Sequence, residues 1–278
     1  MSEASKTALL VAAYRARETA EGGICDDPWA AALAGDEGHA LAERYDRSNP
    51  HMQLWTAVRT AFIDERVRRA LRKPHDVRQV VILGAGLDTR AARLATEGVR
   101  FFEVDRASTQ QEKLTRLQAA KGYPTACARY VTCDFETEDF VERLGAAGFR
   151  TADPAFVVWE GVTPYLSEGA VRATLRRITG GLAPESVLVF DHLRKKIVRG
   201  DVRDPVDLES RDFVADLGEP LRFGVDDVLP LLYEEGFRHV RASSFDEVCL
   251  ALTGTYLRER KFRFQGLAVT SRAASELP

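Results

Sequence analysis

Apolar residues in the first part of the chain recur at mixed three- and four-residue spacing, the periodicity of an amphipathic helix. Helices are therefore expected over residues 5–18, 28–44 and 53–71. Glycine and polar residues at Gly22-Gly23 and Ser48-Asn49-Pro50 separate these segments. Residues 1–75 are accordingly interpreted as a helical N-terminal cap.

From residue 77 the pattern changes to short apolar runs that alternate with longer, more polar segments. The apolar runs predict buried strands over residues 77–83, 100–104, 129–133, 155–159 and 186–190. The segments between and after them predict helices over residues 89–97, 108–121, 138–147 and 167–182. Strands and helices that alternate in this way form βαβ units, so a parallel sheet with right-handed crossovers is expected.

The alternation stops at residues 194–224, which are charged, short of apolar runs and carry two prolines. We interpret this stretch as an insertion within a domain that spans residues 76–278. After it the pattern predicts one helix and two strands, over residues 225–235, 240–245 and 262–269. These two strands lack an intervening glycine-rich turn, and the final one could run antiparallel to the others.

Composition narrows the class of protein without identifying it. The chain has 278 residues, of which 45% are hydrophobic and 29% charged, as in ordinary globular proteins. Its net charge of −3 favours neither nucleic acid nor an anionic membrane surface as a partner. It has no apolar run of roughly 18 residues, no signal-peptide pattern, and no C-x-x-C pair among its four cysteines. A cytoplasmic protein without a structural zinc site is therefore expected.

Four successive strands are followed by an acidic residue: Asp105, Asp134, Glu160 and Asp191. In an open α/β sheet, ligands bind in the crevice at the carboxyl ends of the strands. A single acid there often only caps the next helix, but four in succession predict a polar ligand held across this edge of the sheet.

The first strand ends in a turn, Gly84-Ala85-Gly86, followed by Leu87-Asp88-Thr89. Glycine is suited to a sharp turn against which a ligand packs. Thr89 stands in the place of the third glycine of the dinucleotide fingerprint, which weakens a nicotinamide-binding interpretation. Asp105, after the second strand, could accept hydrogen bonds from both hydroxyls of an adenosine ribose. After the third strand, Asp134 and Phe135 suit an adenine, although Phe135 could equally be a core aromatic.

These motifs, with others, resemble the leucine carboxyl methyltransferase family, in particular its bacterial members, which include polyketide O-methyltransferases. The resemblance extends from about residue 5 to residue 195. It is carried by Ser5-Lys6-Thr7-Ala8, Arg59-Thr60 with Ile63-Asp64, Gly84 to Arg90 (GAGLDTR), Phe102 to Asp105 (FEVD), and Glu160 to Leu166 (EGVTPYL). It implies the class I methyltransferase fold: a doubly wound α/β domain with a seven-stranded, mostly parallel sheet and extra N-terminal helices over the pocket.

The resemblance also implies S-adenosylmethionine as the cofactor and a role for each matching residue. Lys6 and Arg59 would pair with the methionine carboxylate, for which a guanidinium fork is well shaped. Gly84 and Gly86 would form the turn beneath the methionine portion. Glu160 would face the cofactor's amino group. The ribose and the adenine would be held by the residues already named for them, Asp105 and the Asp134-Phe135 pair.

The reaction expected from this resemblance is methyl transfer to an oxygen of a small organic acceptor. A carboxylate acceptor needs no general base, whereas a hydroxyl acceptor would benefit from one. His192, next to Asp191, is a candidate base, although it could simply be a loop histidine. Tyr165 could bind the acceptor oxygen or serve in packing. The basic residues of the insertion could clamp an acidic acceptor or lie exposed in a loop.

Two other functions remain open at this point. A protein's C-terminal carboxylate could be the methyl acceptor, and a nicotinamide-dependent oxidoreductase would share the fold class.

Overall fold

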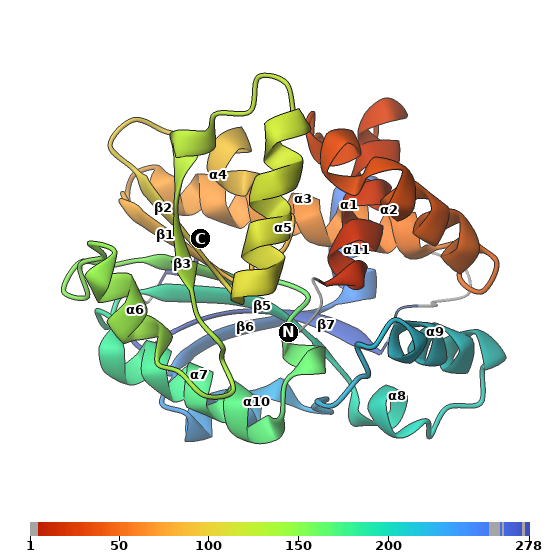
Figure 1. Cartoon of the computed structure of the whole chain (residues 1–278). Coiled ribbons are helices and arrows are strands. Elements are labelled where there is room, and N and C mark those ends of the chain that lie inside the picture. The colour runs from red at the N-terminus through yellow and green to blue at the C-terminus, as the bar shows by residue number, and fades with distance from the viewer. Residues whose placement is uncertain (1–4, 256–261, 263, 274–275) are drawn as a thin grey trace.

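The computed structural model describes residues 5–255, 262, 264–273 and 276–278. Its centre is a seven-stranded sheet with the order β3-β2-β1-β4-β5-β7-β6 (Figure 1). The first five strands run parallel, and β7 runs antiparallel to both β5 and β6. The expected fold class and the antiparallel final strand are confirmed. The strands are β1 (Gln79–Leu83), β2 (Arg100–Asp105), β3 (Ala128–Thr132), β4 (Phe156–Trp159), β5 (Val187–Leu193), β6 (His239–Ser244) and β7 (Gln265–Ser271).

The sheet lies between two layers of helices, so its central strands are apolar on both faces. Alternate side chains of one strand enter different cores: Val80 packs on one side of the sheet and Val81 on the other. One core is closed by α3 (Met52–Leu71), α4 (Arg90–Arg93) and α11 (Phe245–Thr253). The other is closed by α6 (Phe140–Ala146), α7 (Glu168–Gly181) and α10 (Val228–Glu234) (Figure 1).

A third apolar cluster joins the N-terminal cap to the rest of the molecule. Helices α1 (Lys6–Ala20) and α2 (Ala30–Asp46) pack against each other and against α5 (Ala107–Ala119). Phe213 of the insertion stacks edge-on against Tyr45, with ring centroids 4.6 Å apart. The N-terminal cap and the insertion therefore meet above the carboxyl ends of the strands.

The structure corrects three expectations about local elements. Residues 194–224 contain two helices, α8 (Lys195–Arg199) and α9 (Pro205–Asp216), where only a charged insertion was expected. The sequence signal for α9 is Asp204, whose side chain accepts a hydrogen bond from the Val206 N–H, followed by proline at the first helical position. The helix expected over residues 89–97 is only the short α4.

The third correction is α11, which was not expected. The strand predicted to end at residue 245 stops at Ser244, which caps this helix. Ser244 and Glu247 form a capping box in which each side chain bonds to the other residue's backbone N–H. The S-x-x-E spacing was therefore the overlooked signal.

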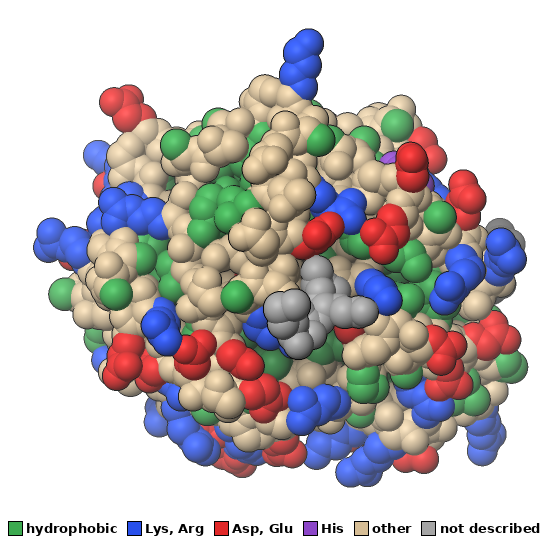
Figure 2. Space-filling view, viewed as in Figure 1, with side chains coloured by type: hydrophobic (Ala, Val, Ile, Leu, Met, Phe, Trp, Pro, Cys, Tyr) green, Lys and Arg blue, Asp and Glu red, His purple; other side chains and the backbone are tan. Residues whose placement is uncertain are grey.

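Two short 3₁₀ helices complete the fold, η1 (Thr125–Cys127) and η2 (Thr163–Tyr165). Within the described part of the chain, no helix is both long and apolar enough to cross a membrane. On the face drawn in Figure 2, Lys and Arg side chains are interspersed with Asp and Glu side chains.

Candidate functional site

A cavity of about 280 Å³ opens at the carboxyl ends of the parallel strands. The four strand-end acids, Asp105, Asp134, Glu160 and Asp191, all line it, as the sequence predicted. The other walls come from the turn after β1, from α1 and α3 of the N-terminal cap, and from α8 and α9 of the insertion. A ligand here would thus contact the sheet edge and the cap together.

The turn after β1 forms the floor of the cavity. Gly84 and Gly86 both have positive φ, at 66° and 48°, a region that residues with a side chain rarely adopt. A Cβ atom at Gly84 would lie 2.2 Å from Cγ2 of Val162, so the close approach also excludes any side chain. Both glycines are therefore required by the local geometry, as their place in the motif suggested.

Asp105 lies beside this turn and is fixed by the backbone. Its Oδ2 accepts a hydrogen bond from the Gly86 N–H at 2.6 Å, and its Oδ1 accepts one from the Arg106 N–H at 2.7 Å. A carboxylate has about four acceptor positions, so each oxygen retains capacity for one more donor. Burial raises the pKa of this carboxyl above its ordinary value. The group suits a ligand with two neighbouring hydroxyls.

Asp134 and Phe135 lie next along the same edge of the sheet. The Glu136 N–H donates to Asp134 Oδ1 at 3.0 Å, which orients the carboxylate. Phe135 is buried and packs edge-on against Phe140, with centroids 6.2 Å apart, yet it also lines the cavity. Phe135 therefore belongs to the core and also forms part of the cavity wall, and its contact with an adenine stays a prediction.

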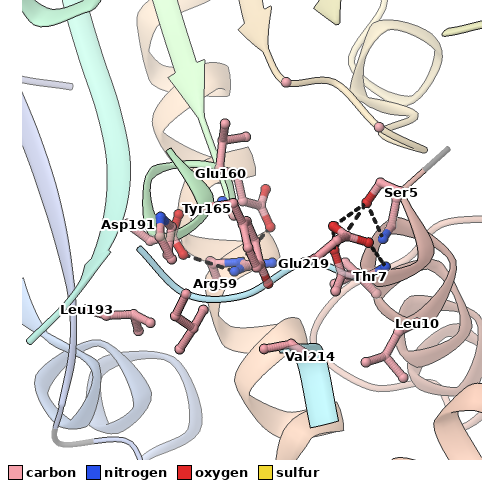
Figure 3. Close-up of a pocket in the computed structure, with 18 of the residues that line it drawn as sticks. Ser5, Thr7, Leu10, Arg59, Glu160, Tyr165, Asp191, Leu193, Val214 and Glu219 are labelled. Carbon is pink, nitrogen blue, oxygen red and sulfur yellow. Dashed lines mark hydrogen bonds and ion pairs between the residues drawn. The ribbon is translucent and has the colours of Figure 1, made fainter. Parts of the chain in front are cut away.

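Arg59 projects from α3 to the other side of the cavity, where it links two acids (Figure 3). Its Nε lies 2.7 Å from Glu160 and its Nη1 lies 3.0 Å from Asp191. The guanidinium also stacks over the ring of Trp55, 3.7 Å from its centroid. From sequence alone, Arg59 would have passed for a surface residue of a helix; in the structure it is only 3% exposed.

The second oxygen of Glu160 pairs with Arg90 at 2.5 Å. Burial opposes ionisation of Glu160, but Arg90 and Arg59 outweigh it and hold the pKa below its usual value. Arg90 also pairs with Asp64, at 2.6 Å, and with Asp88. The motif residues of α3, the glycine turn and β4 therefore form one buried ionic network, which sequence spacing alone could not reveal.

Comparison with known proteins identifies the family. A sequence model described as leucine carboxyl methyltransferase matches residues 8–179, more than half of the chain. The chain belongs to the leucine carboxyl methyltransferase family. The resemblance drawn from the sequence motifs is thereby confirmed, and membership of this family argues against the nicotinamide-dependent alternative.

Similar proteins from this family carry provisional names. A Mycobacteroides abscessus protein, provisionally named an S-adenosyl-L-methionine-dependent methyltransferase, is 31% identical over 229 residues, which cover 78% of this chain and 76% of that protein. A Parafrankia protein with the same provisional name is 36% identical over 195 residues, which cover 67% of this chain. That match spans 62% of the Parafrankia protein's length.

Two solved structures share the fold. A DUF574 family protein from Streptomyces avermitilis aligns with a TM-score of 0.64 at 16% identity, covering 94% of this chain and 97% of that one. A Thermobifida fusca protein, provisionally described as a methyltransferase, aligns with the same score and identity, covering 97% and 95%. At this identity the likeness supports the fold.

Lys6 contributes differently from what the family resemblance implied. Its backbone N–H donates to Glu219 Oε1 at 2.7 Å, and the residue is not among the described residues that line the cavity. The structure thus brings Arg59 to the cavity but not the side chain of Lys6.

Glu219 is a cavity residue that the sequence did not single out. It follows α9, and its carboxylate caps the N-terminus of α1 (Figure 3). It accepts hydrogen bonds from the Thr7 N–H at 3.0 Å, the Thr7 hydroxyl at 2.8 Å and the Ser5 hydroxyl at 3.0 Å, besides that from Lys6. Glu219 therefore ties the insertion to the cap over the cavity. An isolated glutamate in a charged stretch gives no sequence signal of this contact.

Tyr165 and His192, the two candidate catalytic residues, separate in the structure. Tyr165 lies in η2 and lines the cavity, and burial raises the pKa of its hydroxyl well above the ordinary value. His192 does not line the cavity. It belongs to β5, so its side chain points away from the face to which Asp191 points.

His192 instead packs beside the ring of Phe190, with centroids 6.0 Å apart, and over Gly266. Burial lowers the pKa of the imidazole to about 4. The expectation that Asp191 would orient His192 as a general base was therefore wrong, because neighbouring residues of a strand face opposite sides of the sheet. The strand expected over residues 186–190 continues to Leu193, so His192 is a strand residue and not the loop residue that its predicted position implied.

Proposed function

We propose that this chain transfers the methyl group of S-adenosylmethionine to an oxygen of a small organic molecule, of the kind found in polyketide-type secondary metabolism. Its family and its named relatives support the coarser assignment as an S-adenosylmethionine-dependent methyltransferase. The observation that carries the proposal is the convergence of the four strand-end acids and the glycine turn on one cavity.

The residues of this cavity fit S-adenosylmethionine in the chemistry of their donors and acceptors. Asp105 would accept from the two ribose hydroxyls with the acceptor positions that the backbone leaves open. Asp134 would accept from the adenine amine, with Phe135 as an apolar wall. Gly84 would allow the methionine portion to lie directly on the turn, where a Cβ atom has no room.

The methionine end would lie toward Arg59 and Glu160, which face the cavity as a connected pair of opposite charges. An amino acid group carries both charges, so an ammonium could approach Glu160 while its carboxylate approaches Arg59. Lys6 could assist only if its side chain turned toward the cavity. The low pKa of Glu160 keeps it ionised at neutral pH, as an ammonium partner must be.

The bound cofactor would supply a methyl group on a positively charged sulfur, which is already a strong electrophile. The chain would then need mainly to align the acceptor oxygen and to exclude water. Tyr165 could hold the acceptor oxygen with its hydroxyl, which burial keeps protonated and therefore able to donate. The cap and the insertion, tied together by Glu219, would keep water out.

Calorimetric titration with S-adenosylhomocysteine, the demethylated product, tests the proposal. We expect micromolar binding to the wild type and a loss of about tenfold or more for Asp105→Asn, which keeps the shape but loses the charged acceptor. Glu97→Gln, at an exposed position away from the cavity, is the matched control. The proposal fails if the wild type does not bind, and the ribose assignment fails if Asp105→Asn binds as tightly as the control.

A further inference from the structure

Four of the five arginines in the described lining of the cavity pair with an acid. Arg59 contacts Glu160 and Asp191, and three of the others each pair with one acid. Those pairs are Arg15 with Asp27 at 2.9 Å, Arg211 with Asp212 at 2.6 Å, and Arg222 with Glu136 at 3.0 Å. Arg106 adjoins Asp105, at the end of the cavity assigned to the ribose. The described lining residues include neither lysine nor histidine.

The end of the cavity farthest from the ribose is the place for an acceptor. The strand order sets Asp105 and Asp134 at the β2–β3 side, whereas α8 and α9 follow the carboxyl end of β5, three positions along the sheet from β2 (Figure 1). We call this end the acceptor lobe. Its apolar walls are formed by Met52, Leu193, Ile197, Val214, Leu221 and Phe264.

The ionisable residues in the described lining of the acceptor lobe are acids or an arginine that pairs with an acid. Asp207 lines it from α9, and Glu219 lines it from the following loop. Glu219 accepts four hydrogen bonds from the start of α1, which uses the acceptor positions of its carboxylate. Arg211, the cation on this wall, pairs with the neighbouring and largely exposed Asp212. An anionic acceptor would thus be desolvated next to carboxylates, and the described lining of this lobe offers it no cation without an acid partner.

We propose that the acceptor is an uncharged, largely apolar molecule that presents a phenolic or enolic hydroxyl, and that a carboxylate is not the methylated group. The inference rests on the proposed methyl transfer and narrows its acceptor. In the balanced reaction the hydroxyl oxygen gains the methyl group, the carbon–sulfur bond breaks with its electron pair left on sulfur, and the hydroxyl proton passes to solvent. A phenolic or enolic hydroxyl is acidic enough to release its proton as the oxygen–carbon bond forms. It can therefore bind as a neutral molecule in a lobe whose described residues offer no imidazole base.

Three probes of one shape test this inference: 2-naphthol, 2-naphthoate and 2-naphthylmethylammonium. Each is titrated at pH 7 into protein already saturated with S-adenosylhomocysteine. We expect neutral 2-naphthol to bind at least about tenfold more tightly than 2-naphthoate, whose charge would be desolvated beside carboxylates. It should also bind more tightly than the ammonium, which would lose its hydration shell while the acceptor positions of Glu219 are already used. Equal or tighter binding of 2-naphthoate or of the ammonium would overturn the inference, as would absence of binding by all three.

A charge-placement variant sharpens the test. Val214→Arg puts a cation into the acceptor lobe and should strengthen 2-naphthoate binding by about tenfold. Val206→Arg, on the same helix but outside the cavity lining, should leave it unchanged. Leu221→Lys repeats the test from the neighbouring loop if Val214→Arg does not fold. Failure of S-adenosylhomocysteine to bind would count against the proposed function itself, whereas its binding without the naphthol preference would count against this inference alone.

Discussion

Arg59→Lys is the substitution that probes the site's ionic network most sharply. The arginine bridges two buried carboxylates through two different nitrogens, 2.7 Å from Glu160 and 3.0 Å from Asp191. A lysine keeps the positive charge but has one compact ammonium group, which cannot reproduce both contacts in the same geometry. One buried carboxylate would therefore lose its charged partner.

The expected cost follows from what is lost. One hydrogen bond to a buried charged group contributes roughly 1.5–3 kcal/mol, and stacking on the Trp55 ring contributes about 0.5–2 kcal/mol. We expect Arg59→Lys to lower the free energy of unfolding by about 2–5 kcal/mol. With a urea m-value of about 3 kcal/mol/M, the midpoint would fall by about 1 M.

The assay is urea unfolding at several pH values, with Arg69→Lys as control. Arg69 lies on the same helix and pairs with Glu65 at 2.8 Å, but both side chains are exposed, so its loss should cost at most about 0.5 kcal/mol. Burial already raises the pKa of Asp191. Without its guanidinium partner this carboxyl should protonate more readily, so Arg59→Lys should regain stability as the pH falls from about 8 to about 5. The reasoning is refuted if Arg59→Lys and Arg69→Lys are equally stable, or if the loss of unfolding free energy in Arg59→Lys does not depend on pH.

Four further predictions address single features. Gly84→Ala should abolish S-adenosylhomocysteine binding measured by calorimetry. Gly98→Ala should bind normally, because Gly98 shares the positive φ but has no atom within 4 Å of the added Cβ. Equal binding by the two variants would contradict the close-approach argument. His192→Gln should leave that affinity within about twofold, since the side chain faces away from the cavity, and a tenfold loss would restore it as a site residue. Glu219→Gln should lower the free energy of unfolding by about 1–2 kcal/mol in urea titrations, because a charged cap of α1 is lost; no change would show that this contact is not stabilising. The affinity for S-adenosylhomocysteine should be constant near pH 7 and should fall on acidification as Asp105 is protonated. Because the pKa of Asp105 is raised, this fall should start at a higher pH than for an exposed aspartate. Unchanged affinity down to about pH 4 would contradict the raised pKa.

Much of the fold was predictable because its central strands are buried on both faces and so form continuous apolar runs in the sequence. The glycine turn and the four strand-end acids were predictable because each directly follows a strand. Parallel strands bring their carboxyl ends to one edge of the sheet, where these residues meet. Asp105 and Asp134 are local features of this kind. Each is placed by the strand that immediately precedes it.

The remaining features depend on distant parts of the chain. Glu219 meets Thr7 across 212 positions of sequence, and no local pattern encodes that contact. Arg59 is identifiable by family resemblance, but its bonds to Glu160 and Asp191 depend on how α3 crosses the sheet. The prediction for His192 was wrong because β5 continues to Leu193. As neighbouring residues of a strand, Asp191 and His192 point to opposite faces of the sheet.

The most direct measurement of the central claim is a crystal structure of the wild-type chain with S-adenosylhomocysteine. We predict that the ribose hydroxyls bond to Asp105, that the methionine portion lies on Gly84, and that its amino acid group lies between Arg59 and Glu160. A ligand bound outside this cavity, or one bound inside it with the ribose away from Asp105, would contradict the account.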